Sequence, residues 1–205
     1  MHLLRLRILF SACFFSTGAA LLVYIISAFS LLAALARMLA IGGLTVALIW
    51  HRSSDADRKK LRRSAHAGAI SGLLATGAYD LSRYVVIETA GFEYWPFDVF
   101  TIFGRALIGA GYQGAWITVA GLTYHLANGV GFAIAYTALF GSKGPLAGIA
   151  WAMALELLMI SIYPGWLEVN PIDEFIQISA LGHLAYGTVL GFTARHLLKN
   201  RGIEG

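Results

Sequence analysis

Two stretches of this chain follow one pattern: residues 68–80 read GAISGLLATGAYD, and residues 144–156 read GPLAGIAWAMALE. In each stretch three small residues and then an acid recur at every fourth position: Gly68, Gly72, Thr76 and Asp80, then Gly144, Gly148, Ala152 and Glu156. Positions four residues apart lie on one face of a helix. Small residues on that face let two helix backbones approach closely inside a membrane. The sequence therefore predicts two closely packed helices, each with an acid on its packed face.

A histidine motif follows each of these stretches. Residues 125–129 read HLANG, and residues 183–187 read HLAYG. An acid-bearing helix and a histidine-bearing helix thus occur twice in the same order. We predict a tandem repeat of two helix hairpins, whose copies are related by an axis along the membrane normal. Residues 67–141 form the first copy and residues 142–205 form the second.

The composition is that of a membrane protein. Of the 205 residues, 58% are hydrophobic and 13% are charged, whereas about a quarter are charged in soluble proteins. Apolar runs of about 20 residues span a bilayer as helices. We therefore predict an all-α, polytopic membrane protein with about six transmembrane helices, and the lipid bilayer as its surroundings. Two spans form an N-terminal hairpin in residues 1–50, and the other four cover about 67–89, 115–140, 145–163 and 175–197.

The charged residues predict the orientation of these spans. Residues 51–66 form a basic loop, and Lys and Arg concentrate in the cytoplasmic loops of membrane proteins. We place this loop and both termini, including Arg201, in the cytoplasm, so the protein lies in the inner membrane. The acidic residues Glu168, Asp173 and Glu174 fall on the other side. This distribution accounts for the net charge of +4, so we expect no nucleic acid partner.

The segment at residues 91–114 joins the two helices of the first copy on the outer side. Its first part, residues 91–105, is rich in aromatic side chains, and Pro96 is expected near the start of a helix. Three roles are open: an interfacial helix that anchors the bundle, a lid over the polar residues, or a surface for a partner subunit. Aromatic residues favour the membrane interface whatever their function.

Polar residues gather at one predicted depth in the outer half of the membrane. They come from both copies and from the second span: Asp80, Arg83, His125, Asn128, Glu156, His183 and Arg37. Ionisable residues inside a membrane are costly and usually functional. We predict binding or transport of a small polar substrate or ion. The two acids would exchange protons or bind a cation, and the two arginines would hold an anionic group.

Several alternatives stay open. Asp80, His125, Glu156 and His183 could bind a divalent metal, because two imidazoles and two carboxylates suit zinc, manganese or iron. His125 and His183 could instead hold a b-type haem as axial ligands. The metal could be bound with or without catalysis, and a metal- or haem-bearing membrane enzyme is one alternative. No hydrolase motif accompanies these residues, so the catalytic residues stay unknown.

The same residues could also be architectural. Ion pairs of Asp80 with Arg83 and of Glu156 with Arg37 would then stabilise the bundle. A non-catalytic subunit of a larger complex, bound to a membrane partner subunit or to a second copy of itself, is compatible with this hypothesis.

Overall fold

A computed structural model describes residues 2–167 and 170–199 of the chain. Two residues used in the orientation argument, Glu168 and Arg201, lie outside these ranges. The described residues form eight helices and no strand: α1 (His2–Cys13), α2 (Ser16–Ile26), α3 (Leu31–Arg52), α4 (Asp55–Ala90), α5 (Asp98–Ile108), α6 (Ala115–Phe140), α7 (Pro145–Leu167) and α8 (Ile172–Lys199). The prediction of an all-α fold is confirmed for this part of the chain.

The long helices are apolar enough for a membrane. Within the described residues, α3, α6, α7 and α8 have the length and hydropathy of membrane spans, and the bent pair α1–α2 could serve as a fifth. The chain is therefore a helical membrane protein surrounded by lipid. The number of six spans stays a prediction, because α4 is not among these candidates. Its apolar part carries Asp80 and Arg83, which lower its mean hydropathy.

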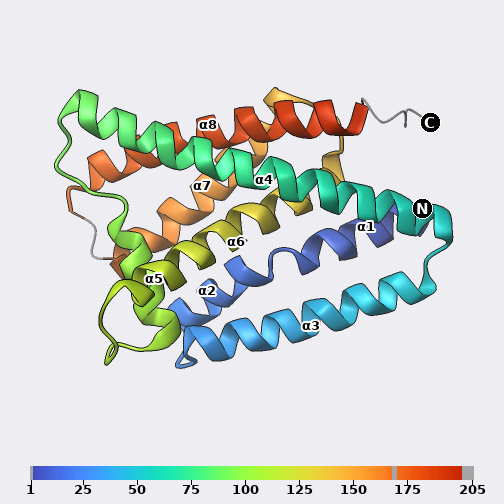
Figure 1. The fold of residues 1–205 in the computed structure, drawn as a ribbon, viewed down its shortest axis with the longest axis horizontal. Coiled ribbons are helices and arrows are strands. Elements are labelled where there is room, and N and C mark those ends of the chain that lie inside the picture. The colour runs from blue at the N-terminus through green and yellow to red at the C-terminus, as the bar shows by residue number, and fades with distance from the viewer. Residues whose placement is uncertain (1, 168–169, 200–205) are drawn as a thin grey trace.

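The helices run along the long axis of the molecule (Figure 1). The start of α1, the α3–α4 connection and the end of α8 lie at one end of the bundle, which we call the basic end. The short helix α5 lies at the other end, which we call the α5 end. Chain direction therefore alternates between successive long helices. Which end faces the cytoplasm stays a prediction.

Two predicted segments differ from the structure. Residues 55–66 were expected to be loop, but they are the first three turns of α4. Ser54 caps this helix, since its hydroxyl accepts a hydrogen bond from the Asp57 amide. A Ser N-cap followed by residues without Gly or Pro favours helix. The first predicted span is also not continuous, because α1 and α2 meet at an angle of 54°.

The four helices that carry the two motifs pack as antiparallel pairs through their small residues. In the α4–α6 pair, a Cβ atom on Gly72 would lie 2.8 Å from the Val130 Cα. In the α7–α8 pair, a Cβ atom on Gly187 would lie 2.6 Å from the Ile149 Cα. α4 also packs closely against α8, which joins the two pairs. The backbone approach predicted from the glycine pattern is thus present in both pairs, while a tandem repeat stays a prediction.

A dense core fills the bundle from its middle toward the basic end. It consists of small and aromatic side chains from α4, α6, α7 and α8: Ala75, Tyr79, Ala133, Tyr136, Ala152, Tyr186, Leu190 and Ala194. Two tyrosine hydroxyls tie the helices together here. Tyr186 donates to the Gly129 carbonyl at 2.6 Å, and Tyr136 donates to the Gly144 carbonyl at 3.1 Å. This core closes off the space that opens toward the α5 end.

Candidate functional site

A cavity of about 120 Å³ lies between the dense core and the α5 end. Its floor is formed by Thr76, Gly129 and Tyr186, at the edge of the core. Residues of the aromatic outer segment and of the ends of α7 and α8 cover it: Tyr94, Pro96, Val99, Phe103, Leu167 and Phe175. Most of the wall is therefore apolar or aromatic, as in typical small-molecule pockets.

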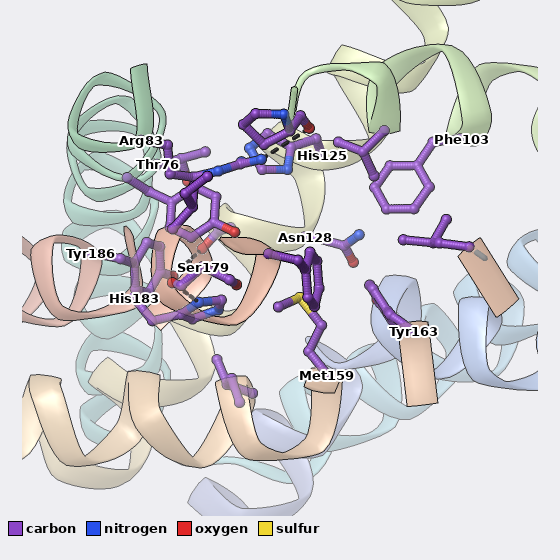
Figure 2. A pocket seen from close by; sticks show the side chains of 18 of the residues that line it. Thr76, Arg83, Phe103, His125, Asn128, Met159, Tyr163, Ser179, His183 and Tyr186 are labelled. Carbon is purple, nitrogen blue, oxygen red and sulfur yellow. Dashed lines mark hydrogen bonds between the residues drawn. The ribbon is translucent and has the colours of Figure 1, made fainter. Parts of the chain in front are cut away.

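The polar side chains enter this cavity from three helices. His125 and Asn128 come from α6, Arg83 comes from α4, and Ser179 and His183 come from α8. Figure 2 shows Arg83, Ser179 and His183 on one side of the cavity, with Phe103 and Tyr163 across from them. Each of these helices is held in register by the close packing described above, so the arrangement depends on the fold.

In the first helix pair, an acid holds one imidazole. The Asp80 Oδ2 lies 3.1 Å from the His125 Nε2, while its Oδ1 lies 3.2 Å from the Arg83 Nη1. The other Arg83 terminal nitrogen donates to the Pro96 carbonyl at 2.9 Å. Arg83 is only 5% exposed, and its guanidinium also lies 4.6 Å from the centre of the Tyr79 ring. Asp80 therefore balances a buried charge and orients His125 at the same time.

In the second helix pair, the acid is buried more deeply. Glu156 is 1% exposed, and its Oε2 lies 2.8 Å from the His183 Nδ1. The Ser179 hydroxyl donates to the same oxygen at 2.8 Å. The His183 Nδ1 also lies 3.0 Å from the Ser179 carbonyl oxygen. Because this nitrogen faces two acceptors, it carries the hydrogen, and the Nε2 has no partner among the described residues.

The two imidazoles are thus held by opposite nitrogens. The acid contacts the Nε2 of His125 but the Nδ1 of His183. The Tyr79 ring contacts both, with its centre 5.8 Å from the His125 ring and 5.0 Å from the His183 ring. Asp80 and Glu156 do not line the cavity themselves. They act behind the histidines, as carboxylates do when they fix the orientation of an imidazole.

Some buried polar atoms at the site have no partner among the described residues. They are the Asn128 Oδ1, the Glu156 Oε1 and the Arg83 Nε. A buried polar atom without a hydrogen bond costs about 1 to 3 kcal/mol. Of these residues Asn128 lines the cavity, and its Oδ1 is an acceptor that a ligand with a hydrogen-bond donor would satisfy.

The covering segment is held in place by an acid on α8. The Glu174 Oε2 accepts hydrogen bonds from the Glu93 and Tyr94 amides, each at 2.8 Å. Burial raises the pKa of the Tyr94 hydroxyl, although the nearby charge of Arg83 lowers it. Tyr94 therefore stays protonated and available as a donor at neutral pH.

Two cofactor predictions do not fit this geometry. The described residues contain no group of three or more His, Cys, Asp or Glu side chains that could hold a metal ion. The four predicted ligands, Asp80, His125, Glu156 and His183, form two separate pairs instead, so the shared metal site is not supported. A haem bridging His125 and His183 would have to displace the Tyr79 ring, which contacts both.

One residue of the predicted group of polar residues, Arg37, does not lie with the others. Arg37 is exposed on α3, and its guanidinium lies 4.4 Å from the centre of the Phe29 ring. It does not line the cavity. The proposed ion pair of Glu156 with Arg37 is wrong, because Glu156 is paired with His183. The ion pair of Asp80 with Arg83 is present.

Several residues of the site were missed by sequence reasoning. Ser179 lies four residues before His183, so its place on the same helix face could have been predicted. Tyr79 precedes Asp80, and nothing in the sequence marks it as the ring that contacts both histidines. Met159 and Tyr163 read as ordinary apolar positions of a membrane span.

Comparison with protein-family models, with curated proteins and with solved structures finds no match to this chain. The class of protein that the fold defines is a helical membrane protein. Its site is an internal cavity with two imidazole–carboxylate pairs in its wall, and the function is argued below from that geometry.

Proposed function

We propose that this membrane protein binds a small organic molecule in the cavity and uses His125 and His183 to contact its polar groups. One observation carries the proposal: both imidazoles line the same cavity, and a carboxylate behind each one fixes its orientation. Oriented hydrogen-bonding groups in an otherwise apolar pocket are what gives a ligand site its specificity.

The volume of the cavity limits the size of the molecule. An apolar cavity of roughly 150 Å³ in another protein accommodates benzene, and this cavity is about 120 Å³. A single six-membered ring or an aliphatic molecule of similar size fits. The many aromatic side chains in the wall favour a ring that can stack against them.

The charges favour a neutral or cationic ligand over an anionic one. Two carboxylates stand at the site, whereas Arg83 is the one arginine that lines the cavity among the described residues, and it is already paired with Asp80. With both imidazoles neutral, the charges of Asp80, Glu156 and Arg83 add up to one net negative charge. The unpartnered Asn128 Oδ1 adds an acceptor. A phenol or a small amine therefore suits the site better than a carboxylate.

Proton exchange and transport are the further parts of this proposal. Histidine is a common proton-exchanging side chain in proteins, so we include proton exchange at His125 or His183 in the proposal. Transport additionally needs a route to the basic end, past the packed side chains of the dense core. A carrier would have to open it by moving the α7–α8 pair against the α4–α6 pair, as repeat-based carriers do.

Three probes that share one benzene ring and differ in charge test the binding proposal. Phenol, benzylamine and benzoate are added to the purified protein in detergent, and thermal unfolding is followed by tryptophan fluorescence. A ligand present at 100 times its Kd stabilises the folded state by about 2.7 kcal/mol. Phenol or benzylamine should raise the unfolding temperature and benzoate should not. No response to any of the three, or a response to benzoate alone, would contradict the proposal.

A cavity-filling variant supplies the control. Met159→Trp places a large ring in the cavity, whereas Leu158→Trp places it on the neighbouring residue, which is 50% exposed toward lipid. The probe effect should disappear in the first variant and persist in the second. Persistence of the effect in Met159→Trp would mean that the probes bind elsewhere on the protein, which contradicts the proposal.

A further inference from the structure

A second group of side chains lies far from the cavity, on the first turns of α4. Lys59, Arg62, Arg63 and His66 line one groove at the basic end. Arg62, Arg63 and His66 lie three, four and seven residues after Lys59, and these spacings bring all of them to one face of the helix. Three positive charges, those of Lys59, Arg62 and Arg63, are thus concentrated on one face.

The expected crossing of the membrane by α4 would place this face at the membrane edge, and the proposal below rests on that crossing. α4 has 36 residues and is roughly 54 Å long at about 1.5 Å per residue. The hydrocarbon core of a bilayer is only about 30 Å thick. The apolar part of α4 begins at Ala67, so the basic face lies immediately beyond it, at the depth of the lipid headgroups.

The nearby acids do not neutralise this face. Asp55 pairs with Arg58 at 3.3 Å, and Asp57 accepts a hydrogen bond from the Ser54 hydroxyl. In the part of the chain that the structure describes, no ion pair involves Lys59, Arg62 or Arg63. The positive charges are therefore available to an anion from outside the chain.

Arg63 is already fixed in position. One terminal nitrogen donates to the Leu198 carbonyl at 2.8 Å, which ties the guanidinium to the end of α8. The Nε of the same side chain is buried and has no partner among the described residues. The buried Nε cannot reach a headgroup, but hydrogen-bonding capacity remains on the other terminal nitrogen, for which no hydrogen bond is found within the described residues. An arginine that is fixed in orientation suits an oxyanion better than a mobile surface side chain does.

We propose that this face binds the phosphate of an anionic phospholipid headgroup, with Lys59, Arg62 and Arg63 contacting the phosphate. Basic clusters next to the membrane attract anionic lipids, and each Lys or Arg contributes about 1 kcal/mol. The surrounding bilayer supplies such headgroups at this depth. The site is independent of the cavity and of the function proposed for it.

The test compares lipids and charge variants. Purified protein is mixed with micelles that contain phosphatidylglycerol or phosphatidylcholine, and bound lipid is counted by native mass spectrometry. The double variant Lys59→Gln/Arg62→Gln removes two exposed charges from the face and leaves Arg63 in place. The control Arg52→Gln/Lys143→Gln removes two exposed charges from other positions at the basic end.

The wild type and the control should bind phosphatidylglycerol in preference to phosphatidylcholine. The Lys59→Gln/Arg62→Gln variant should bind phosphatidylglycerol roughly 30-fold more weakly, as the loss of two basic contacts implies. Equal binding of the two lipids by the wild type, or equal loss in both variants, would overturn the proposal.

A further arm uses inorganic phosphate in place of the lipid and follows thermal unfolding. Stabilisation by millimolar phosphate in the wild type, absent in the Lys59→Gln/Arg62→Gln variant, would assign the face to soluble phosphate compounds and overturn the lipid proposal. No effect of phosphate, together with tight binding of phosphatidylglycerol, is the expected result.

Discussion

The two acid–imidazole pairs differ at the residue three positions after the acid. Asp80 is followed by Arg83, and Glu156 is followed by Met159. Asp80 therefore contacts a buried cation as well as an imidazole, whereas Glu156 contacts an imidazole and a hydroxyl. Removing one partner of a buried ion pair costs about 3 to 5 kcal/mol, because the other charge is left without compensation.

A double-mutant cycle tests this difference. Asp80→Asn should lower the free energy of unfolding by about 3 kcal/mol. The double variant Asp80→Asn/Arg83→Met should be more stable than Asp80→Asn, since the uncompensated cation is gone. Chemical denaturation in detergent is applied to the wild type, Asp80→Asn, Arg83→Met and the double variant, with the exposed Glu88→Gln on the same helix as control. Strictly additive losses would show that Asp80 does not compensate the charge of Arg83.

At the scale of elements, the glycines set the distance between paired helices. Gly72 faces the backbone of α6, whereas Gly77 on the same helix has nothing within 4 Å of a built Cβ. Gly72→Ala should lower the unfolding temperature, because α4 and α6 must move apart. Gly77→Ala should leave it unchanged or raise it, since Ala favours helix over Gly by up to about 1 kcal/mol. Equal effects of the two substitutions would show that close packing at Gly72 is unimportant.

The covering segment depends on one side chain of α8. Glu174 accepts two backbone hydrogen bonds from residues 93 and 94, so Glu174→Ala should free these amides. Hydrogen exchange at residues 92–97 should become faster, and a probe bound in the cavity should dissociate faster. The neighbouring Asp173 is exposed, and Asp173→Ala should change neither rate. Unchanged exchange in Glu174→Ala would mean that other contacts hold the segment.

At the scale of the whole molecule, the path of α4 decides the number of spans. Its direction and its packing against α6 and α8 lead us to expect that it crosses the membrane, although its hydropathy alone does not require this. Single cysteines at Ala56 and Ala90, in a Cys13→Ala background, should react with a membrane-impermeant thiol reagent from opposite sides. A cysteine in place of Lys143 should react from the same side of the membrane as a cysteine in place of Ala56. Labelling of Ala56 and Ala90 from the same side would exclude a crossing.

Much of the fold could be predicted from the amino-acid sequence. Apolar runs of about 20 residues predict membrane helices, in which each backbone polar group is satisfied within its own segment. The period of four residues in 68–80 and 144–156 identified the packed faces of α4 and α7. The prediction of a loop at residues 55–66 is wrong. Its charged residues indicate a position outside the membrane, but they also favour helix.

The sequence by itself determined that acids and histidines lie on the inner faces of membrane helices, because charge is costly in lipid and small residues mark the packed face. Only the tertiary structure decided that they form two separate pairs, with Tyr79 against both imidazoles and Arg37 elsewhere. A periodic pattern fixes the face and the approximate depth of a side chain. Whether the four side chains form one shared site or two separate pairs depends on differences of a few ångströms in their positions. Helix rotation and rotamer choice decide these positions, and both are set by packing between residues far apart in the chain.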